Sequence, residues 1–278
     1  MKTISPFKEV AEAIIEAGGE TLKSCYQCGL CTGTCPWNLV RSFMLRRMLH
    51  EAQFGVVDLE SEDVWLCATC HACVARCPRG VEVVDIMRAF RRTIVGLGVA
   101  KVPDSLRITM KNIAGVGNPQ GEAPERRADW AKDLKVKIFT KGTELLYFPC
   151  CTSIFEPRVK GVAHATVDIL NKAKVDFGTL GTKENCCGES IRKAGNESLF
   201  QNLAQSNINA FADNGVNTIL VSSPHCYETF KKEYPKLGAS FEVIHSTQYL
   251  LRLIKEQRLK FTKELNKRVA YHDPCYLG

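Results

Sequence analysis

The sequence predicts an α + α/β chain, with an N-terminal α-helical domain followed by a C-terminal doubly wound α/β domain. In residues 1–118, two dense runs of cysteines are each followed by an apolar stripe at helical spacing. In residues 144–278, short apolar runs alternate with helical patterns, which is typical of a parallel sheet covered by helices. Residues 119–143 are interrupted by glycine and proline and are predicted to be a linker.

The composition favours metal-bound thiols in a reducing compartment. The chain has 278 residues, enough for two domains, and 14 cysteines. Disulfide scaffolds this rich in cysteine are typical of short secreted chains, and Met1-Lys2-Thr3 does not predict a secretory signal. No stretch approaches the roughly 18 consecutive apolar residues of a membrane helix. We therefore expect a cytoplasmic location.

The net charge of +7 does not predict a nucleic-acid partner, because the chain has no long basic run. Clusters bound by thiolates are anionic, so part of the positive excess is expected to neutralise them. Arg41, Arg46 and Arg47 lie off the apolar stripe of their predicted helix. They form either a solvated face or a docking surface for an acidic partner or an anionic substrate.

Two cysteine runs with identical spacing give the strongest signal in the chain. Each reads Cys-x-x-Cys-x-x-Cys-x-x-x-Cys-Pro, and they span residues 25–36 and 67–78. This spacing resembles that of bacterial-type ferredoxins, which bind two cubane [4Fe–4S] clusters and use the fourth cysteine of each run for the other cluster. A pair of zinc sites is the alternative, but zinc modules usually carry two separated cysteine pairs.

The ferredoxin resemblance implies two ligand sets. The first cluster is expected on Cys25, Cys28, Cys31 and Cys77. The second cluster is expected on Cys67, Cys70, Cys73 and Cys35. His71, inside the second run, is expected to lie at the surface or to hydrogen-bond near the cluster rather than to bind iron.

Helices are predicted around both runs. The predicted helices cover residues 6–17, 37–54, 63–68 and 81–95. Ser5 is the expected N-cap of the first helix, which Gly18 should end, and Gly55 suits the position after the second. Arg91 lies off the apolar stripe of the last helix. Because both runs are followed by helices, the domain is expected to be an α-helical ferredoxin domain.

Five short apolar runs predict the sheet of the C-terminal domain. The predicted strands cover residues 145–148, 175–177, 218–221, 241–244 and 268–271. The helices between them are predicted at residues 158–173, 197–211 and 246–255. Ligands of such a sheet bind beyond the carboxyl ends of the strands. The cysteines that follow these strands are Cys151, Cys186, Cys187, Cys226 and Cys275. Their thiols are therefore expected to converge on a metal cluster.

The order Cys151, Cys186-Cys187-Gly188 and Cys226 resembles the cysteine-rich CCG module of heterodisulfide reductases. The N-terminal domain resembles the electron-delivering subunit of the same enzymes. The fused order is similar to the catalytic subunits of sulfate reducers' membrane redox complexes. The resemblance covers essentially the whole chain.

The chain departs from the CCG pattern at one position. The family's terminal Cys-x-x-Cys reads Ser223-Pro224-His225-Cys226 here. A five-cysteine module of this family binds a non-cubane [4Fe–4S] cluster, whereas this module has four cysteines, or five if Cys150 substitutes. A non-cubane cluster, a cubane cluster and zinc are therefore alternatives, with Cys150 and His225 as further candidate ligands.

The last ten residues resemble the start of a second CCG module, because Cys275 follows a run that echoes residues 145–151. The chain stops at Gly278, before a second Cys-Cys-Gly, so this module is expected to be incomplete, through truncation or completion by another chain. Cys275 is a candidate metal ligand there. His272 is expected to be a structural hydrogen-bonding residue rather than a proton donor.

The resemblance implies an iron–sulfur electron-transfer subunit of an oxidoreductase. Electrons would pass through two [4Fe–4S] clusters to a third iron–sulfur cluster or zinc centre, for reduction of a disulfide-type substrate. The implied partners are a flavoprotein or a membrane quinone or cytochrome subunit, which would attach the chain to the inner face of the cell membrane. One alternative is the iron–sulfur subunit of a flavoprotein- or quinone-linked oxidoreductase, and another is a non-catalytic electron carrier with structural zinc.

Overall fold

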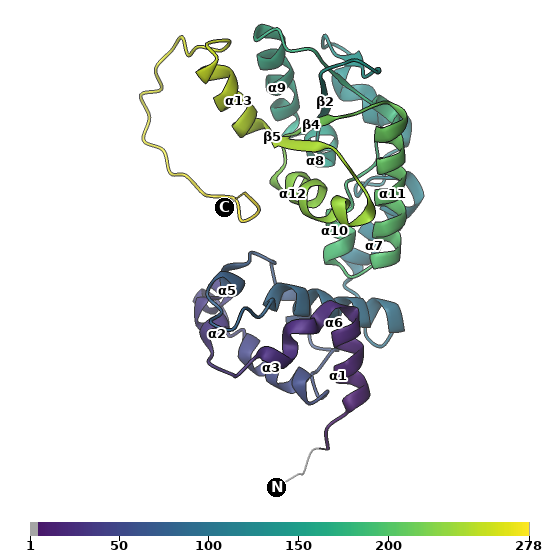
Figure 1. Ribbon diagram of the computed structural model, residues 1–278, viewed down its shortest axis with the longest axis vertical. Coiled ribbons are helices and arrows are strands. Elements are labelled where there is room, and N and C mark those ends of the chain that lie inside the picture. The colour runs from purple at the N-terminus through teal and green to yellow at the C-terminus, as the bar shows by residue number, and fades with distance from the viewer. Residues whose placement is uncertain (1–4, 278) are drawn as a thin grey trace. The chain divides into compact units, whose positions relative to one another are not determined.

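The computed structural model describes residues 5–277, which form two compact units (Figure 1). Unit 1 contains the chain up to Arg107 together with Ser190–Glu197. Unit 2 contains Ile108–Glu189 and the chain from Ser198 onward. The expectation that Met1-Lys2-Thr3 begins no secretory signal concerns residues outside the described range.

The described part of unit 1 is built from helices. They are α1 (Lys8–Ile14), η1 (Ile15–Gly19), η2 (Glu20–Ser24), α2 (Leu30–Thr34), η3 (Pro36–Leu39), α3 (Leu45–Gln53), α4 (Asp63–Leu66), α5 (Ala72–Ala75) and α6 (Val83–Leu97). Helix α6 is the centre of the core, because its predicted stripe, including Ile86, Phe90 and Ile94, is fully buried. Helix α10 (Glu189–Lys193) begins at the last residue of a unit 2 segment and continues in unit 1, and α7 (Asp104–Val116) crosses from unit 1 to unit 2.

The helix predicted over residues 6–17 was wrong at its start. Helix α1 begins at Lys8 rather than in the turn after Ser5, because the Phe7 N–H donates to the Phe54 carbonyl at 2.8 Å and holds the chain outside the helix. The helical backbone is interrupted at Gly18, as predicted, because Gly18 has a φ of 104°, and η2 follows this kink.

The helix predicted over residues 37–54 is two helices, η3 and α3. The Asn38 side chain separates them, because its amide donates to the Phe43 carbonyl at 3.0 Å and accepts from the Phe43 N–H at 2.9 Å. Val40, predicted to lie on the apolar stripe, is 76% exposed in the loop between the helices. Gly55 follows α3 with a positive φ, as predicted.

Unit 2 is organised around a parallel sheet of five strands, which confirms the predicted fold class. The strands are β1 (Lys137–Ile138), β2 (Leu145–Phe148), β3 (Phe177–Thr179), β4 (Thr218–Val221) and β5 (Glu242–His245). Their order in the sheet is β1-β3-β2-β4-β5. The helices are η4 (Pro124–Ala131), α8 (Cys151–Phe155), α9 (Lys160–Lys172), η5 (Gly181–Lys183), α11 (Glu197–Asp213), α12 (Pro224–Glu228), η6 (Thr229–Glu233), η7 (Tyr234–Leu237) and α13 (Ser246–Lys255).

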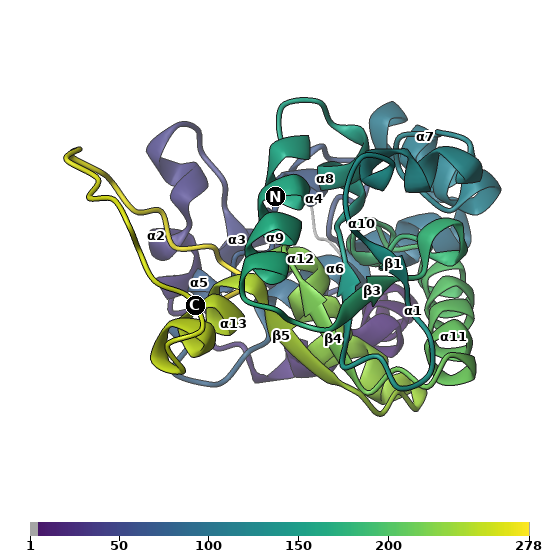
Figure 2. The same ribbon diagram turned by 90° about the horizontal axis from the view of Figure 1, so that it is seen from above.

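The strand predicted over residues 268–271 was wrong. These residues lie in an extended loop after α13 (Figures 1 and 2), where Tyr271 is 83% exposed. The fifth strand is instead β1, inside the segment predicted to be a linker. Its two residues are both exposed and carry no apolar pattern that would predict a strand.

The sheet is covered on both faces. Tyr147 of β2 packs with Leu170 of α9 and Leu253 of α13 in one buried cluster. The next residue, Phe148, points to the other face, where its ring lies 6.3 Å from Phe211 of α11. Since β3 and β4 lie on opposite sides of β2, the chain reverses direction across the sheet at β2 and β4. The carboxyl ends of these two strands therefore flank a topological switch point, the usual place for a ligand in this architecture.

Candidate metal centres

Each predicted ligand set of unit 1 borders its own hollow. The first hollow is lined by Cys25, Cys28, Cys31 and Cys77, and also by Tyr26, Arg46 and Arg79. The second hollow is lined by Cys35, Cys67, Cys70 and Cys73, and also by Trp37, Leu45 and Val84. The two hollows are similar in size, each about 20 Å³. The structure thus brings the fourth cysteine of each run to the hollow of the other run.

The two cysteine runs share an unusual backbone. In the first run, Gln27 and Gly29 flank the second cysteine with φ values of 70° and 83°. In the second run, Thr69 and His71 hold the same positions with φ values of 55° and 61°. Non-glycine residues rarely adopt a positive φ, so the surrounding structure must enforce it. The strain curls each run around its hollow, and it gives His71 a backbone role that spacing did not reveal.

N–H donors reach the sulfurs of the first hollow. The Val81 N–H donates to Cys77 Sγ at 3.3 Å, and the Gln27 amide donates to Cys25 Sγ at 3.4 Å. Hydrogen bonds of this kind stabilise thiolates that bind iron and tune cluster potentials. In the second hollow, burial raises the pKa of the Cys73 thiol to about 12 and so favours the neutral thiol. A bound metal cation would instead favour the thiolate. Sets of four thiols with these surroundings fit iron–sulfur clusters.

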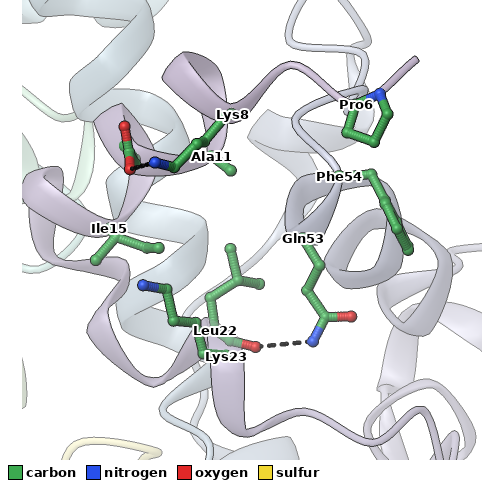
Figure 3. Close-up of a pocket in the computed structure, with 9 residues that line it drawn as sticks. Pro6, Lys8, Ala11, Ile15, Leu22, Lys23, Gln53 and Phe54 are labelled. Carbon is green, nitrogen blue, oxygen red and sulfur yellow. Dashed lines mark hydrogen bonds and ion pairs between the residues drawn. The ribbon is translucent and has the colours of Figure 1, made fainter.

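A larger pocket of about 490 Å³ lies beside the first hollow and contains none of the predicted ligands. Figure 3 shows Gln53 on its wall, where the amide of Gln53 donates to the Leu22 carbonyl at 3.1 Å. The same amide nitrogen donates to the Cys25 carbonyl at 2.9 Å, and Gln27 donates to the Gln53 oxygen at 3.3 Å. Gln53 therefore anchors the start of the first cysteine run from outside.

Arg91 ties the second run to the rest of unit 1. Its guanidinium donates to the carbonyls of Val64 at 3.0 Å, Cys67 at 2.8 Å and Lys193 at 3.0 Å. Arg91 is only 5% exposed, because three backbone acceptors satisfy it. Lys193 belongs to the segment that follows the Cys186-Cys187-Gly188 loop in sequence. The off-stripe position of Arg91 was predicted, but this buried role was not.

Five cysteines of unit 2 lie beyond the carboxyl ends of β2, β3 and β4. Cys150 and Cys151 follow β2, Cys186 and Cys187 follow η5 beyond β3, and Cys226 lies in the first turns of α12 beyond β4. All are buried except Cys150, which is partly buried. The structure thus brings together the four predicted CCG cysteines and Cys150, which the sequence pattern favoured less.

Hydrogen bonds link these five thiols into one group. A bond with the Cys226 thiol lowers the pKa of Cys150 to about 5, and the Ser223 hydroxyl adds to that effect. Bonds with Cys186 and Cys226 lower the pKa of Cys187 to about 6. A bond with Cys186 and burial raise the pKa of Cys151 well above its usual value. Cys150 therefore lies beside Ser223, the position at which the CCG pattern has its additional cysteine.

A buried ion pair that the sequence did not predict supports this group. Arg127 of η4 donates to Cys151 Sγ at 3.3 Å, and its guanidinium lies 3.6 Å from the Glu184 carboxylate. Both side chains are at most 3% exposed. Burial raises the pKa of Glu184 to about 7, and the charge of Arg127 opposes that rise. Arg127 lies within a polar stretch of the predicted linker, where its sequence neighbours give no sign of burial.

Polar contacts and one glycine hold the Cys-Cys-Gly loop. Asn207 of α11 donates to the Cys186 carbonyl at 2.9 Å, and the Tyr234 hydroxyl donates to the Cys187 carbonyl at 3.1 Å. Gly188 has a φ of 84° and donates its N–H to Cys186 Sγ at 3.4 Å. A Cβ at Gly188 would lie 2.8 Å from the Phe200 ring, so glycine is required by this packing.

The other candidate residues of unit 2 lie outside the buried group. His225 is about half-exposed and forms a 2.9 Å contact with Glu189, and its ring lies 4.8 Å from the ring of Tyr276. Cys275 and His272 are exposed in the loop after α13, where no strand precedes them. Among residues 5–277, no three His, Cys, Asp or Glu side chains have the arrangement of a site for one metal ion. The all-thiol donor set of the group fits a cluster of iron and sulfide.

Comparison with known families finds two matches. Residues 21–81 match the 4Fe-4S dicluster domain, and residues 145–231 match the cysteine-rich CCG domain. The chain is 38% identical over 225 residues to the EtfAB:quinone oxidoreductase of Syntrophomonas wolfei, a match that covers 78% of this chain and 31% of the relative. It is 30% identical over 287 residues to a subunit of the dihydromethanophenazine:CoB--CoM heterodisulfide reductase of Methanosarcina mazei, a match that covers 92% of this chain and 69% of the relative.

A third relative matches a smaller share of the chain. It is a subunit of the H(2)/formate:CoB-CoM heterodisulfide,ferredoxin reductase of Methanococcus maripaludis, and it is 36% identical over 131 residues, or 44% of this chain and 71% of the relative. The chain spans about a third of the length of the first curated relatives that it matches. Within residues 5–277, no helix has both the length and the apolar composition needed to cross a lipid bilayer.

Proposed function

We propose the following function for this chain, which belongs to the family of heterodisulfide reductase-related iron–sulfur oxidoreductase subunits. It passes electrons through two cubane clusters to a CCG-module centre for reduction of a disulfide-type substrate. One observation carries the proposal: two sets of four thiols each border a hollow, and five further thiols are gathered at the switch point of a separate sheet. When bound, clusters at these places supply one-electron transfer.

The proposed ligands follow from the places of the thiols. The first cubane is held by Cys25, Cys28, Cys31 and Cys77. The second cubane is held by Cys67, Cys70, Cys73 and Cys35. The CCG centre is held by Cys151, Cys186, Cys187, Cys226 and Cys150. Cys150 supplies the fifth thiolate, because it hydrogen-bonds with Cys226 beside Ser223.

The chain's own residues prepare the CCG site for anionic ligands. The Arg127 guanidinium is always protonated and donates to Cys151 Sγ, so it offsets negative charge that would otherwise be buried unpaired. Glu184 keeps Arg127 in place. Reduction of one disulfide takes two electrons and two protons and yields two thiols, so the site must deliver two single electrons in succession.

Anaerobic purification followed by iron, zinc and sulfide analysis tests this proposal. We expect about twelve iron atoms per chain, as three four-iron clusters require, and electron paramagnetic resonance signals from more than two centres after reduction. About eight irons with one zinc would instead support an electron carrier with structural zinc. Eight irons and an empty CCG site would rule out disulfide reduction by this chain.

A second candidate function has a specific observation in its favour. The relative with 38% identity is named as an EtfAB:quinone oxidoreductase, so the partner of this chain would be a flavoprotein and its acceptor a quinone. Reduced electron-transferring flavoprotein should then reduce the clusters of the purified chain within seconds, whereas a thiol–disulfide pair should not exchange electrons with them. Under either candidate function, we propose that the chain lies in the cytoplasm and is attached to the membrane through another subunit.

A further inference from the structure

The two hollows of unit 1 differ in the residues at their rims. The first hollow is bordered by the guanidinium-bearing residues Arg46 and Arg79, by Tyr26, which is 58% exposed, and by the exposed Cys28. The second hollow has no Lys, Arg, Asp or Glu among its described lining residues, and Cys73 at its rim is buried. The first hollow is therefore the one with exposed cationic side chains at its rim.

The arginines that line the first hollow have no carboxylate partner among the described residues. Arg41 pairs with Asp63 at 3.3 Å and Arg47 pairs with Glu51 at 2.7 Å, so two of the three arginines first singled out already have carboxylate partners. Arg46 and Arg79 are exposed and form no ion pair with a carboxylate of the described chain. These two charges remain available to a partner.

Exposed aliphatic residues lie in the segments next to this rim. Leu30, next to Cys31 in sequence, is 49% exposed, and Leu39 and Val40 are 88% and 76% exposed. Thr32 joins the two segments, because its carbonyl accepts from the Asn38 amide at 2.8 Å and its hydroxyl accepts from the Arg46 N–H at 2.8 Å. Exposed aliphatic side chains beside unpaired arginines are typical of protein interfaces.

We propose that this face, defined by Tyr26, Leu30, Arg46 and Arg79, is the docking surface for an acidic one-electron carrier protein. The proposal rests on the proposed function, because it places the carrier beside the cysteines of the first cluster. Charge complementarity favours an acidic protein, since Arg46 and Arg79 line the hollow without a carboxylate partner and would pair with carboxylates of the carrier. A carrier docked here would lie next to Cys28, the most exposed cysteine of the set.

The test is a binding measurement on the anaerobically purified full chain with its metal. The probe is a plant-type [2Fe–2S] ferredoxin, an acidic carrier, and its dissociation constant is measured by isothermal titration calorimetry from low to high salt. The variant Arg46→Glu/Arg79→Glu should bind at least about tenfold more weakly at low ionic strength. The difference should vanish near 1 M salt, where the screening length is about 3 Å.

A matched control variant shows whether the position of the charges matters, or only the net charge of the protein. Arg107→Glu/Arg252→Glu changes the net charge equally at two arginines that do not line the hollow and are 69% and 62% exposed. It should bind the ferredoxin within about twofold of the wild type. Equal weakening in both double variants, or no weakening in either, would overturn the proposal. The proposal would also be overturned if Arg46→Glu/Arg79→Glu left ferredoxin binding unchanged and instead weakened self-association, or binding to phosphatidylglycerol vesicles, in a salt-dependent way.

The iron content distinguishes a failure of the docking surface from a failure of the proposed function on which it rests. A wild-type chain without iron would refute the proposed function. An iron-loaded wild type that binds no ferredoxin, or binds it independently of Arg46 and Arg79, would refute only the docking surface. If the glutamate variant loses iron, Arg46→Gln/Arg79→Gln removes the charges without reversal and should give the same direction of change.

Discussion

The thiols of unit 1 and those of unit 2 are assembled in opposite ways. In unit 1, two local runs curl around two hollows, and their cysteines are mostly part-buried with one exposed. In unit 2, the cysteines come from the ends of three different strands, and four of the five are buried. A local run fixes its ligands by spacing and backbone strain, whereas the second site exists only when the sheet is complete.

The difference also concerns charge. The unit 1 hollows meet exposed arginines or apolar side chains, so solvent and partners can balance their charge. The unit 2 group has a buried cation of its own, Arg127, which is held by the buried Glu184. A site assembled from distant segments therefore depends on tertiary contacts for its electrostatics as well as for its ligands.

The largest expected effect tests the exchange of the fourth cysteines. Cys35→Ser should remove the cluster of the second run and about four iron atoms per chain, because Cys35 borders the hollow of Cys67, Cys70 and Cys73. Cys31→Ser, four positions earlier in the same run, should instead affect the first cluster. Iron analysis and electron paramagnetic resonance compare the two variants. Loss of the same signal in both would contradict the exchange.

The next prediction tests whether Cys150 is the fifth ligand of the CCG centre in unit 2. Cys150→Ala should lose most of the CCG centre, because Cys150 supplies the thiol beside Ser223. Adding Ser223→Cys to that variant should restore the centre, since it returns a thiolate to the same corner of the site. Metal content and the spectrum of the third centre report the outcome. A Cys150→Ala chain with a complete third centre would show that Cys150 is not a ligand.

Loss of the buried ion pair between Arg127 and Glu184 should have the next largest effect, and this effect is on stability. Arg127→Gln should lower the free energy of unfolding by about 3–5 kcal/mol, because it leaves Glu184 buried without its partner. The double variant Arg127→Gln/Glu184→Gln should recover part of that loss. Urea denaturation of the metal-free chain measures both. Additive losses in the double variant would show that the two side chains are not coupled.

The smallest effect concerns pH. Burial lowers the pKa of His245, so the folded chain binds its proton less readily than the unfolded chain. Stability should therefore be complete above about pH 6.5 and fall as the pH drops toward the lower folded-state pKa. His245→Gln should flatten this dependence by less than about 1 kcal/mol between pH 7 and 5.5. Urea midpoints at the two pH values measure it, and an unchanged slope would contradict the assignment.

The same contrast explains what could be predicted from sequence. Strands β2 and β4 and helix α13 occur at the predicted residues, because continuous apolar runs and helical periodicity mark them directly. Strand β1 was missed because its two residues are exposed, and α7 because its stripe is weak, with only Ile113 buried. Local pattern reports burial of apolar residues well and burial of polar residues poorly.

The candidate sites follow that rule. The eight cysteines of unit 1 could be paired into hollows from spacing and family resemblance alone. In unit 2 the sequence indicated which strand ends bring cysteines together, but not the place of Cys150 beside Ser223. Arg91 and Arg127 were missed because a buried arginine is recognised only by its distant acceptors, here the Cys67 carbonyl and the Cys151 sulfur.

The transfer of electrons from unit 1 to the thiol-bound centre of unit 2 is the central claim. Rapid freeze-quench electron paramagnetic resonance after mixing with a reduced acidic ferredoxin tests it most directly. We predict that the CCG centre is reduced in the wild type, and far more slowly in a Cys25→Ser/Cys67→Ser chain that keeps that centre. Equal rates of reduction in both chains would contradict this transfer.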